Sequence, residues 1–193
     1  MRTISLLTIH LGSNFGSILQ TIASVKVFEN LNCSVTVVNY IPERCTWKRF
    51  FQVNGKSLMG MIKLLVGLPI VAINKHVYNS YLHKFAHVSK PIYKKDDFVK
   101  VCPVADFYVT GSDQVWNSTY NEGIDRHYFF DGFPLNTVKI SYSSSIGKVE
   151  LDRDEYKEVK RMLGEYKAIS VREKSAQMLI ESMGYKATHL LDP

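Results

Sequence analysis

Apolar runs alternate with segments of helical periodicity along most of the chain. Residues 4–10 form an apolar run, and residues 18–31 then repeat apolar side chains at helical spacing. Two further helices are predicted at residues 152–166 and 173–183, the second closed by Gly184. The remaining strands, rich in apolar and β-branched residues, are predicted at residues 34–40, 106–110, 138–142, 168–171 and 186–191.

This alternation predicts an α/β fold, with a Rossmann-like parallel sheet and flanking helices. In such sheets, ligands bind beyond the carboxyl ends of the strands. We therefore expect the functional residues to lie in the segments that directly follow the predicted strands.

A long insert, residues 41–105, separates the second predicted strand from the third. Its stretch 58–73 is almost wholly apolar, and its sixteen residues are too few to span a bilayer comfortably. The favoured interpretation is a buried helix pair. The alternative is a helix that lies on a membrane surface between basic residues.

Composition and charge narrow the classes of protein and partner. With 193 residues, 46% hydrophobic and 22% charged, the chain can bury a sizeable core, which excludes disordered and fibrous classes. The net charge of +6 favours anionic partners, but no nucleic-acid-binding module accompanies it, so nucleic acid is not expected. Many of the basic residues gather in the insert: Arg44, Lys48, Arg49, Lys56, Lys75, Lys84, Lys90, Lys94 and Lys95.

Cysteine and histidine spacing gives no sign of a metal site. The cysteines Cys33, Cys45 and Cys102 are far apart and indicate reduced thiols in a cytosolic protein. The first apolar run is too brief for a signal peptide. His83 and His87 could share a helix face, but no carboxylate completes a zinc motif, so a solvated helix face is favoured and no metal is expected.

The first strand runs into a glycine-containing turn, LGSNFGS at residues 11–17, followed by a helix. Glycine lets the backbone approach a ligand, and a helix N-terminus offers unpaired N–H groups to an anion. The spacing is neither a dinucleotide-binding fingerprint nor a Walker loop, and a simple tight turn explains it equally well. The candidate binding residues are Asn14, Gly16 and Gln20.

The third strand leads into the most polar motif of the chain, TGSDQVWN at residues 110–117. A simple turn needs glycine and aspartate, but not the glutamine, tryptophan and asparagine beyond them. Amide and carboxylate groups bond sugar hydroxyls and an indole packs on a pyranose ring, so a sugar site is favoured. The candidate residues are Gly111, Ser112, Asp113, Gln114, Trp116 and Asn117.

Two later strand ends add candidates. SYSSSIG at residues 141–147 offers hydroxyls for phosphate or sugar contacts, or is only a serine-rich loop; its candidates are Ser144, Ser145 and Gly147. Arg172 and Glu173 begin a helix, where a cation is unfavourable. A compensating anion would explain Arg172: either Glu173 or a substrate carboxylate or phosphate held by two hydrogen bonds.

The ordered segments LGSNFGSILQ, ADFYVTGSDQVWN, KISYSSSIG, AISVREKSA and HLLDP together resemble the polysaccharide pyruvyl transferase family. GSDQVWN is the most specific of them, and the resemblance covers the whole chain except the insert. It implies two Rossmann-like domains arranged as in GT-B glycosyltransferases. It also implies transfer of pyruvate from phosphoenolpyruvate, as a ketal, to a sugar of a cell-surface polysaccharide or its lipid-linked precursor, without a metal or cofactor.

By this resemblance, Arg172 contacts the donor and Asp113 binds the acceptor or acts as its base. Family members cross into a second domain at a motif similar to Leu191-Asp192-Pro193, so we expect residues 1–193 to be the N-terminal domain, with the C-terminal domain absent. A cytoplasmic location follows, with residues 58–73 as the candidate contact to the inner membrane face. Two alternatives stay open: half of a GT-B glycosyltransferase that uses a nucleotide sugar, or a non-catalytic sugar- or phosphate-binding remnant.

Overall fold

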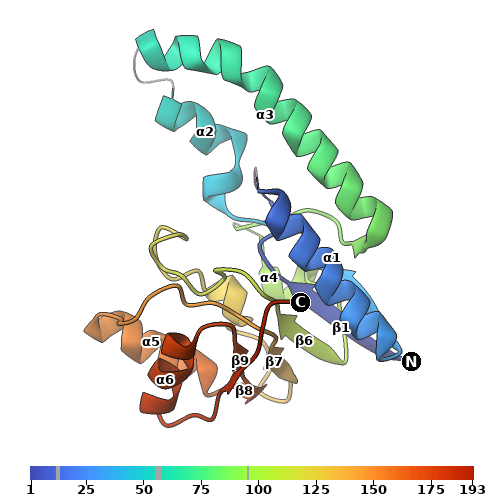
Figure 1. Cartoon of the computed structure of the whole chain (residues 1–193), viewed down its shortest axis with the longest axis vertical. Coiled ribbons are helices and arrows are strands. Elements are labelled where there is room, and N and C mark those ends of the chain that lie inside the picture. The colour runs from blue at the N-terminus through green and yellow to red at the C-terminus, as the bar shows by residue number, and fades with distance from the viewer. Residues whose placement is uncertain (12–13, 55–57, 95) are drawn as a thin grey trace.

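A six-stranded sheet forms the centre of the computed structural model, which describes residues 1–11, 14–54, 58–94 and 96–193 (Figure 1). Every strand pair in this sheet is parallel, so the predicted parallel α/β sheet is confirmed. In sheet order the strands are β4 (His87–Val88), β2 (Cys33–Val37), β1 (Arg2–Leu7), β6 (Phe107–Thr110), β7 (Lys139–Ser141) and β8 (Tyr166–Ala168).

The strand order creates a switch point beside β1. From β1 the chain first builds outward through β2 to β4, and it then crosses back to place β6 on the other side of β1. Connections therefore leave the carboxyl ends of β1 and β6 in opposite directions. In a sheet of this kind a crevice opens there, and it is the expected ligand site.

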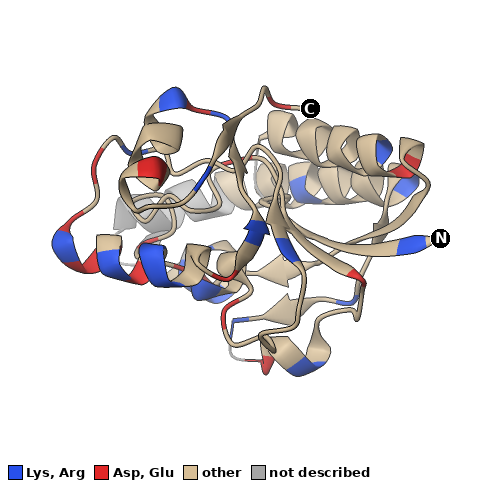
Figure 2. Cartoon of the chain, turned by 90° about the horizontal axis from the view of Figure 1, so that it is seen from below, with Lys and Arg blue, Asp and Glu red and all other residues tan. Residues whose placement is uncertain are grey.

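Helices cover both faces of the sheet, as Figure 2 shows from below. Leu6 of β1 and Val109 of β6 face α1 (Phe15–Asn30), where Val25 and Phe28 complete one buried cluster. The alternate residues Leu7 and Tyr108 belong to a second, larger cluster, because successive side chains of a strand point to opposite faces. That cluster takes in α4 (Phe98–Val101), α5 (Arg153–Leu163) and α6 (Lys174–Ser182).

Local sequence accounts for the two helices nearest the C-terminus. Asp152 caps α5 by accepting hydrogen bonds from the backbone N–H groups of Asp154 and Glu155, both at 2.9 Å. After α6, Gly184 has a φ of +90° and ends the helix as its sequence position predicts.

The predicted strand 168–171 divides into two strands that belong to different sheets. β8 ends at Ala168, whereas β9 (Ser170–Val171) pairs with β10 (Thr188–His189). Ser144 forms parallel bridges to both Asp113 and Val171 and so joins the two sheets. The segments after β6 and β7 therefore lie beside β9 at one edge of the molecule.

The expectation of a buried helix pair at residues 58–73 is wrong. The insert contains η1 (Glu43–Cys45), α2 (Trp47–Asn54), β3 (Tyr40–Ile41) paired with β5 (Ile92–Tyr93), and one 28-residue helix, α3 (Leu58–Phe85), that continues through Pro69. Figure 1 shows α2 and α3 projecting away from the sheet. Because the sheet does not reach this far, Ile70 and Ile73 are 58% and 61% exposed.

Part of what the sequence singled out lies outside the described residues: Gly12 and Ser13 of the glycine turn, Lys56 and Lys95 of the basic group, and the side chains of residues 58–66. Among the helices that the structure describes, we find none with the length and apolar content needed to cross a membrane.

One charged pair inside the fold leads to a stability prediction. Lys139 of β7 is 1% exposed, and its ammonium group is paired with Glu165. Replacing Glu165 by Ala leaves a buried charge without its partner, so we expect the free energy of unfolding to fall by about 3–5 kcal/mol. Urea denaturation measures this.

The matched control is Glu29→Ala, which breaks the exposed Lys26–Glu29 pair and should cost only about 0.2–1 kcal/mol. Equal losses in the two variants would show that the Lys139 pair adds nothing beyond a surface contact.

Candidate functional site

An open pocket of about 440 Å³ lies at the switch point, beyond the carboxyl ends of β1, β6 and β9. A pocket of this size is ordinary for a small-molecule site. Six of the predicted site residues line it: Asn14, Gly16, Gln20, Asp113, Gln114 and Arg172. Four residues that the sequence did not single out as binding groups complete it: Leu11, Ser17, Tyr120 and Asp192.

The N-terminus of α1 forms one wall of the pocket. Asn14 is its N-cap, and the Asn14 Oδ1 atom accepts a hydrogen bond of 2.9 Å from the Gly16 backbone N–H. A Cβ atom at position 16 would come within 3.1 Å of that oxygen, so glycine leaves room for the cap. The first turn of α1 carries no acidic residue, and its positive dipole end is left for an anion.

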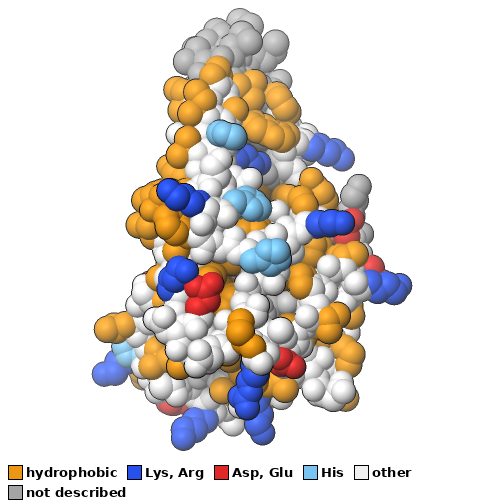
Figure 3. All heavy atoms as spheres, turned by 90° about the vertical axis from the view of Figure 1, so that its right-hand side faces the viewer, with side chains coloured by type: hydrophobic (Ala, Val, Ile, Leu, Met, Phe, Trp, Pro, Cys, Tyr) orange, Lys and Arg blue, Asp and Glu red, His pale blue; other side chains and the backbone are white. Residues whose placement is uncertain are grey.

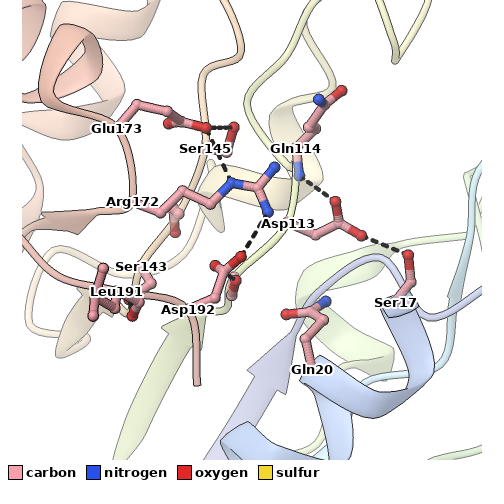
Figure 4. A network of polar contacts seen from close by, with 12 residues as sticks. Ser17, Gln20, Asp113, Gln114, Ser143, Ser145, Arg172, Glu173, Leu191 and Asp192 are labelled. Atoms are coloured by element: carbon pink, nitrogen blue, oxygen red, sulfur yellow. Dashed lines mark hydrogen bonds and ion pairs between the residues drawn. The ribbon is translucent and has the colours of Figure 1, made fainter. Parts of the chain in front are cut away.

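Asp113 faces this helix end from the loop after β6. Its Oδ2 atom accepts a hydrogen bond from the Ser17 hydroxyl at 2.8 Å, and its Oδ1 atom accepts one from the Gln114 backbone N–H, also at 2.8 Å (Figure 4). The φ of Asp113 is +93°, a left-handed conformation that costs a non-glycine residue free energy. The segment after β7 holds it there through a 3.0 Å hydrogen bond from the Ser145 N–H to the Asp113 carbonyl.

Arg172 faces Asp113 across the pocket and is compensated by two carboxylates. Its Nε atom donates to Glu173 Oε1 at 3.0 Å, and its Nη1 atom donates to Asp192 Oδ2 at 3.1 Å (Figure 4). Burial of the guanidinium would lower the pKa of Arg172, but Glu173, Asp192 and Asp113 outweigh it and raise that pKa. The expected anion beside Arg172 is therefore supplied first by Glu173 and then by Asp192.

Glu173 holds Arg172 rather than lining the pocket itself. Its Oε1 atom also accepts a hydrogen bond from the Ser145 hydroxyl. Its Oε2 atom is buried and has no hydrogen-bond partner in the part of the chain that the structure describes.

In α1, the Oε1 atom of Gln20 is likewise buried without a described partner, while its Nε2 atom donates to the Thr8 hydroxyl at 3.2 Å.

The structure does not bring Trp116 to the pocket. Its side chain is 2% exposed and stacks on Phe129, with ring centroids 5.2 Å apart and planes 12° from parallel. The indole N–H donates to the Tyr128 carbonyl at 3.2 Å. The indole thus satisfies both its apolar face and its polar group inside the core, and it offers no face to a sugar.

Asn117 and Gly147 shape the loops behind the pocket. Asn117 Oδ1 accepts from the backbone N–H groups of Thr119 and Tyr120 at 2.9 and 3.1 Å, which fixes a turn. Gly147 has a φ of +63°, and a Cβ atom there would lie 2.4 Å from Asn117 Nδ2. The two residues fit together only because position 147 has no side chain.

The remaining candidates are buried and support the strand ends. Ser144 donates to the carbonyls of Thr110 and Gly111 at 3.0 and 3.1 Å. The Ser112 hydroxyl donates to Asp192, which steadies the second partner of Arg172. A Cβ atom on Gly111 would meet Leu6 and Thr8 side-chain atoms at 3.0 Å, so this strand end packs closely against β1.

Asp192 is the most important residue that sequence reasoning missed. It follows β10, and its position is fixed by Arg172, by Ser112 and by a 2.7 Å hydrogen bond from the Ser143 hydroxyl to the adjacent Leu191 carbonyl. A usable signal existed, because Asp192 directly follows a predicted strand, as the other candidates do. Ser17, at the start of the helix after the glycine turn, was visible in the same way.

A second cavity of about 350 Å³ adjoins the first and shares Leu11 with it. His10 and Asn39 follow β1 and β2 and form its sheet side, with His10 Nε2 and Asn39 Oδ1 3.1 Å apart. Burial lowers the pKa of His10. The insert supplies the other side of this cavity through Trp47, Ala72, Lys75, His76, Tyr78 and Asn79.

The described residues contain no group of three or more His, Cys, Asp or Glu side chains that could hold a metal ion.

In the comparisons with known proteins, the family model described as polysaccharide pyruvyl transferase matches residues 14–193. No curated protein and no solved structure shows significant similarity to the chain.

The contact between Asn117 and Gly147 gives a second stability prediction. Gly147→Ala combines an unfavourable positive φ with a steric clash against Asn117, so we expect the free energy of unfolding to fall by about 2–4 kcal/mol. Gly184→Ala is the matched control, because its φ of +90° is also positive but nothing lies within 4 Å of the added Cβ. It should lose only about 1–2 kcal/mol in urea denaturation. An equal loss of unfolding free energy in the two variants would mean that the loops shift to make room for a Cβ atom at residue 147.

Proposed function

The chain belongs to the polysaccharide pyruvyl transferase family, and we propose that it takes part in transferring pyruvate from phosphoenolpyruvate to a glycan as a ketal. The observation that carries this proposal is the pocket at the switch point. A partly buried guanidinium, a helix N-terminus and a fixed carboxylate converge there: Arg172, α1 and Asp113.

Phosphoenolpyruvate carries a carboxylate and a phosphate that are both attached to C2, so its site needs more than one cationic or N–H-donating group. Arg172 supplies a planar fork of N–H donors, and α1 supplies unpaired backbone N–H groups at its first turn. We place the donor between them. One anionic group of the donor then replaces Asp192 as a partner of Arg172, while Glu173 keeps the guanidinium oriented.

The reaction needs proton transfers at carbon and at oxygen. Protonation of the donor's methylene carbon makes C2 cationic, and a sugar hydroxyl adds to C2 and gives up its proton. Phosphate then leaves with the C–O bonding electrons, a second hydroxyl of the same sugar adds to C2 and loses its proton, and the cyclic ketal closes. Asp113 is the group we propose to accept a hydroxyl proton, because Ser17 and the Gln114 N–H hold its carboxylate in one orientation.

We propose that the acceptor is a cell-surface polysaccharide or its lipid-linked precursor and that it reaches C2 from the second cavity. This cavity adjoins the first at Leu11 and presents amide, imidazole and ammonium groups suited to sugar hydroxyls, from Asn39, His76 and Lys75. The Oε1 atom of Gln20 in the first pocket is buried without a hydrogen-bond partner among the described residues, and it is a further acceptor for a sugar hydroxyl.

We also propose that a second domain covers the pocket in a GT-B-like arrangement, with residues 1–193 as the N-terminal half. The pocket is open in this chain, and Asp192 at its rim is exposed. A cationic C2 needs protection from water, which a covering domain would provide.

We also propose a cytoplasmic location for the protein, supported by the free thiols of Cys33, Cys45 and Cys102.

The substitution Arg172→Ala tests the donor contact, in a form of the protein that is catalytically active. Loss of a bidentate charged contact is worth about 2–3 kcal/mol, so kcat/KM for phosphoenolpyruvate should fall more than about tenfold in a phosphate-release assay. Arg153→Ala, at the exposed start of α5, is the control and should leave the rate unchanged. A folded Arg172→Ala protein with wild-type kcat/KM would remove Arg172 from the donor site.

The base is tested by Asp113→Asn, which keeps the shape of the side chain and its positive φ but removes the carboxylate. We expect kcat to fall by about 10²–10⁴-fold with little change in KM for the donor. Asp106→Asn, at an exposed carboxylate bonded to Thr3, serves as the control. A fall in donor affinity without a fall in kcat would assign Asp113 to binding instead.

A further inference from the structure

The insert carries all of the chain's excess positive charge. Residues 41–105 hold 11 of the 24 Lys and Arg residues but only three of the 18 Asp and Glu residues, a net charge of +8. The other residues together carry −2. From Arg44 to Lys95 the sequence contains no acidic residue at all. A concentration of one sign of charge on one segment indicates an anionic partner for that segment.

Helix α3 presents an exposed apolar stripe within this basic segment. Ile70, Ile73 and Val77 are 58%, 61% and 51% exposed, and their spacing of three and four residues places them on one face of the helix. The other side of the helix is anchored, because Leu82 is fully buried. The stripe is therefore the outward face of a helix that is fixed to the body.

Cationic and neutral polar groups flank the stripe. His76, His83 and Lys84 are exposed on the same helix, and no acidic residue lies among them. Figure 3 views this side of the molecule: hydrophobic, histidine and basic side chains cover its upper part, and acidic side chains appear from about mid-height downward. An apolar face bordered by cations is typical of helices that lie in a membrane interface.

We propose that this face of α3 binds an anionic membrane surface. The stripe enters the boundary between headgroups and acyl chains, and exposed basic groups beside it, such as Lys84, contact lipid phosphates. The charges disfavour the other occupants: two copies of the chain would bring two +8 segments together, and a polyanion such as RNA would leave the apolar stripe without a partner. The proposed membrane contact begins at Ile70, near the C-terminal end of the stretch 58–73 that the sequence analysis singled out, and it continues beyond that stretch.

The placement of α3 gives this contact a consequence for the site. Phe15, the first residue of α1, packs against Tyr78 and Tyr81 with ring centroids 5.8 and 5.4 Å apart. The wall of the pocket is thus in direct contact with the helix that would rest on the membrane. An acceptor anchored in lipid would be presented beside the pocket.

Co-sedimentation of the purified chain with vesicles tests the proposal, and it needs no turnover. We expect binding to phosphatidylcholine vesicles containing phosphatidylglycerol, little binding to pure phosphatidylcholine, and weakening with added salt. The double variant Ile70→Asn/Ile73→Asn should lower the partition coefficient by at least about tenfold. Lys84→Glu should lower it by about fivefold or more.

Matched controls place the same chemical changes elsewhere. Leu135→Asn/Met178→Asn removes two exposed apolar side chains, and Lys186→Glu reverses an exposed charge, both outside the insert. Neither should change binding. Absence of binding to the anionic vesicles overturns the proposal, as does equal binding by the Ile70/Ile73 variant. The proposal is also overturned if light scattering shows a stable dimer that the Ile70/Ile73 variant abolishes. Because the assay measures binding alone, its failure leaves the proposed transfer reaction untouched.

Discussion

Serine hydroxyls hold together the edge of the sheet on which the pocket depends. At the last residue of β7, Ser141 Oγ accepts from the Ser170 N–H at 2.8 Å and donates to the Ser170 carbonyl at 2.9 Å. The Ser170 hydroxyl in turn donates to the Ser141 carbonyl and accepts from the Ser143 N–H. Together with the backbone hydrogen bonds between Ser144 and β9, these side chains fix β9 beside β7. Arg172 follows β9 directly, so its position across from Asp113 rests on this group of buried hydroxyls.

The same hydrogen bonds mark what the sequence could and could not reveal. The periodicity of apolar residues predicted the parallel sheet, because burial on both faces leaves long apolar runs in the strands. It could not show that residues 168–171 contain two strands. That break depends on Ser141 and Ser170 meeting across 29 positions of sequence, which no local pattern records. The serine-rich segment looked equally suited to ligand contacts or to a loop, and the structure uses it as scaffold.

Among the candidate site residues, the sequence was most informative where a residue was out of place. A cation at a helix N-terminus pointed to Arg172, and the structure gives it anionic neighbours. Trp116 carried no such conflict, since a tryptophan fits a core as well as a sugar site. The apolar stretch before Ile73 misled for a related reason. Hydrophobicity reports what a segment would gain from burial, but only tertiary structure shows whether a surface is there to bury it.

The contact between Arg172 and Asp192 gives the pocket an internal competitor. The Asp192 carboxylate takes the position on the guanidinium that a carboxylate from solution would take, and it is tethered to the chain. A tethered group acts at an effective concentration that reaches the millimolar range for short connections. A ligand with a single weak anionic group must compete against that concentration, whereas a ligand with two anionic groups can also engage the helix end. At the proposed donor site, this competition would favour a ligand with two anionic groups over a monocarboxylate, before any group recognises the rest of the substrate.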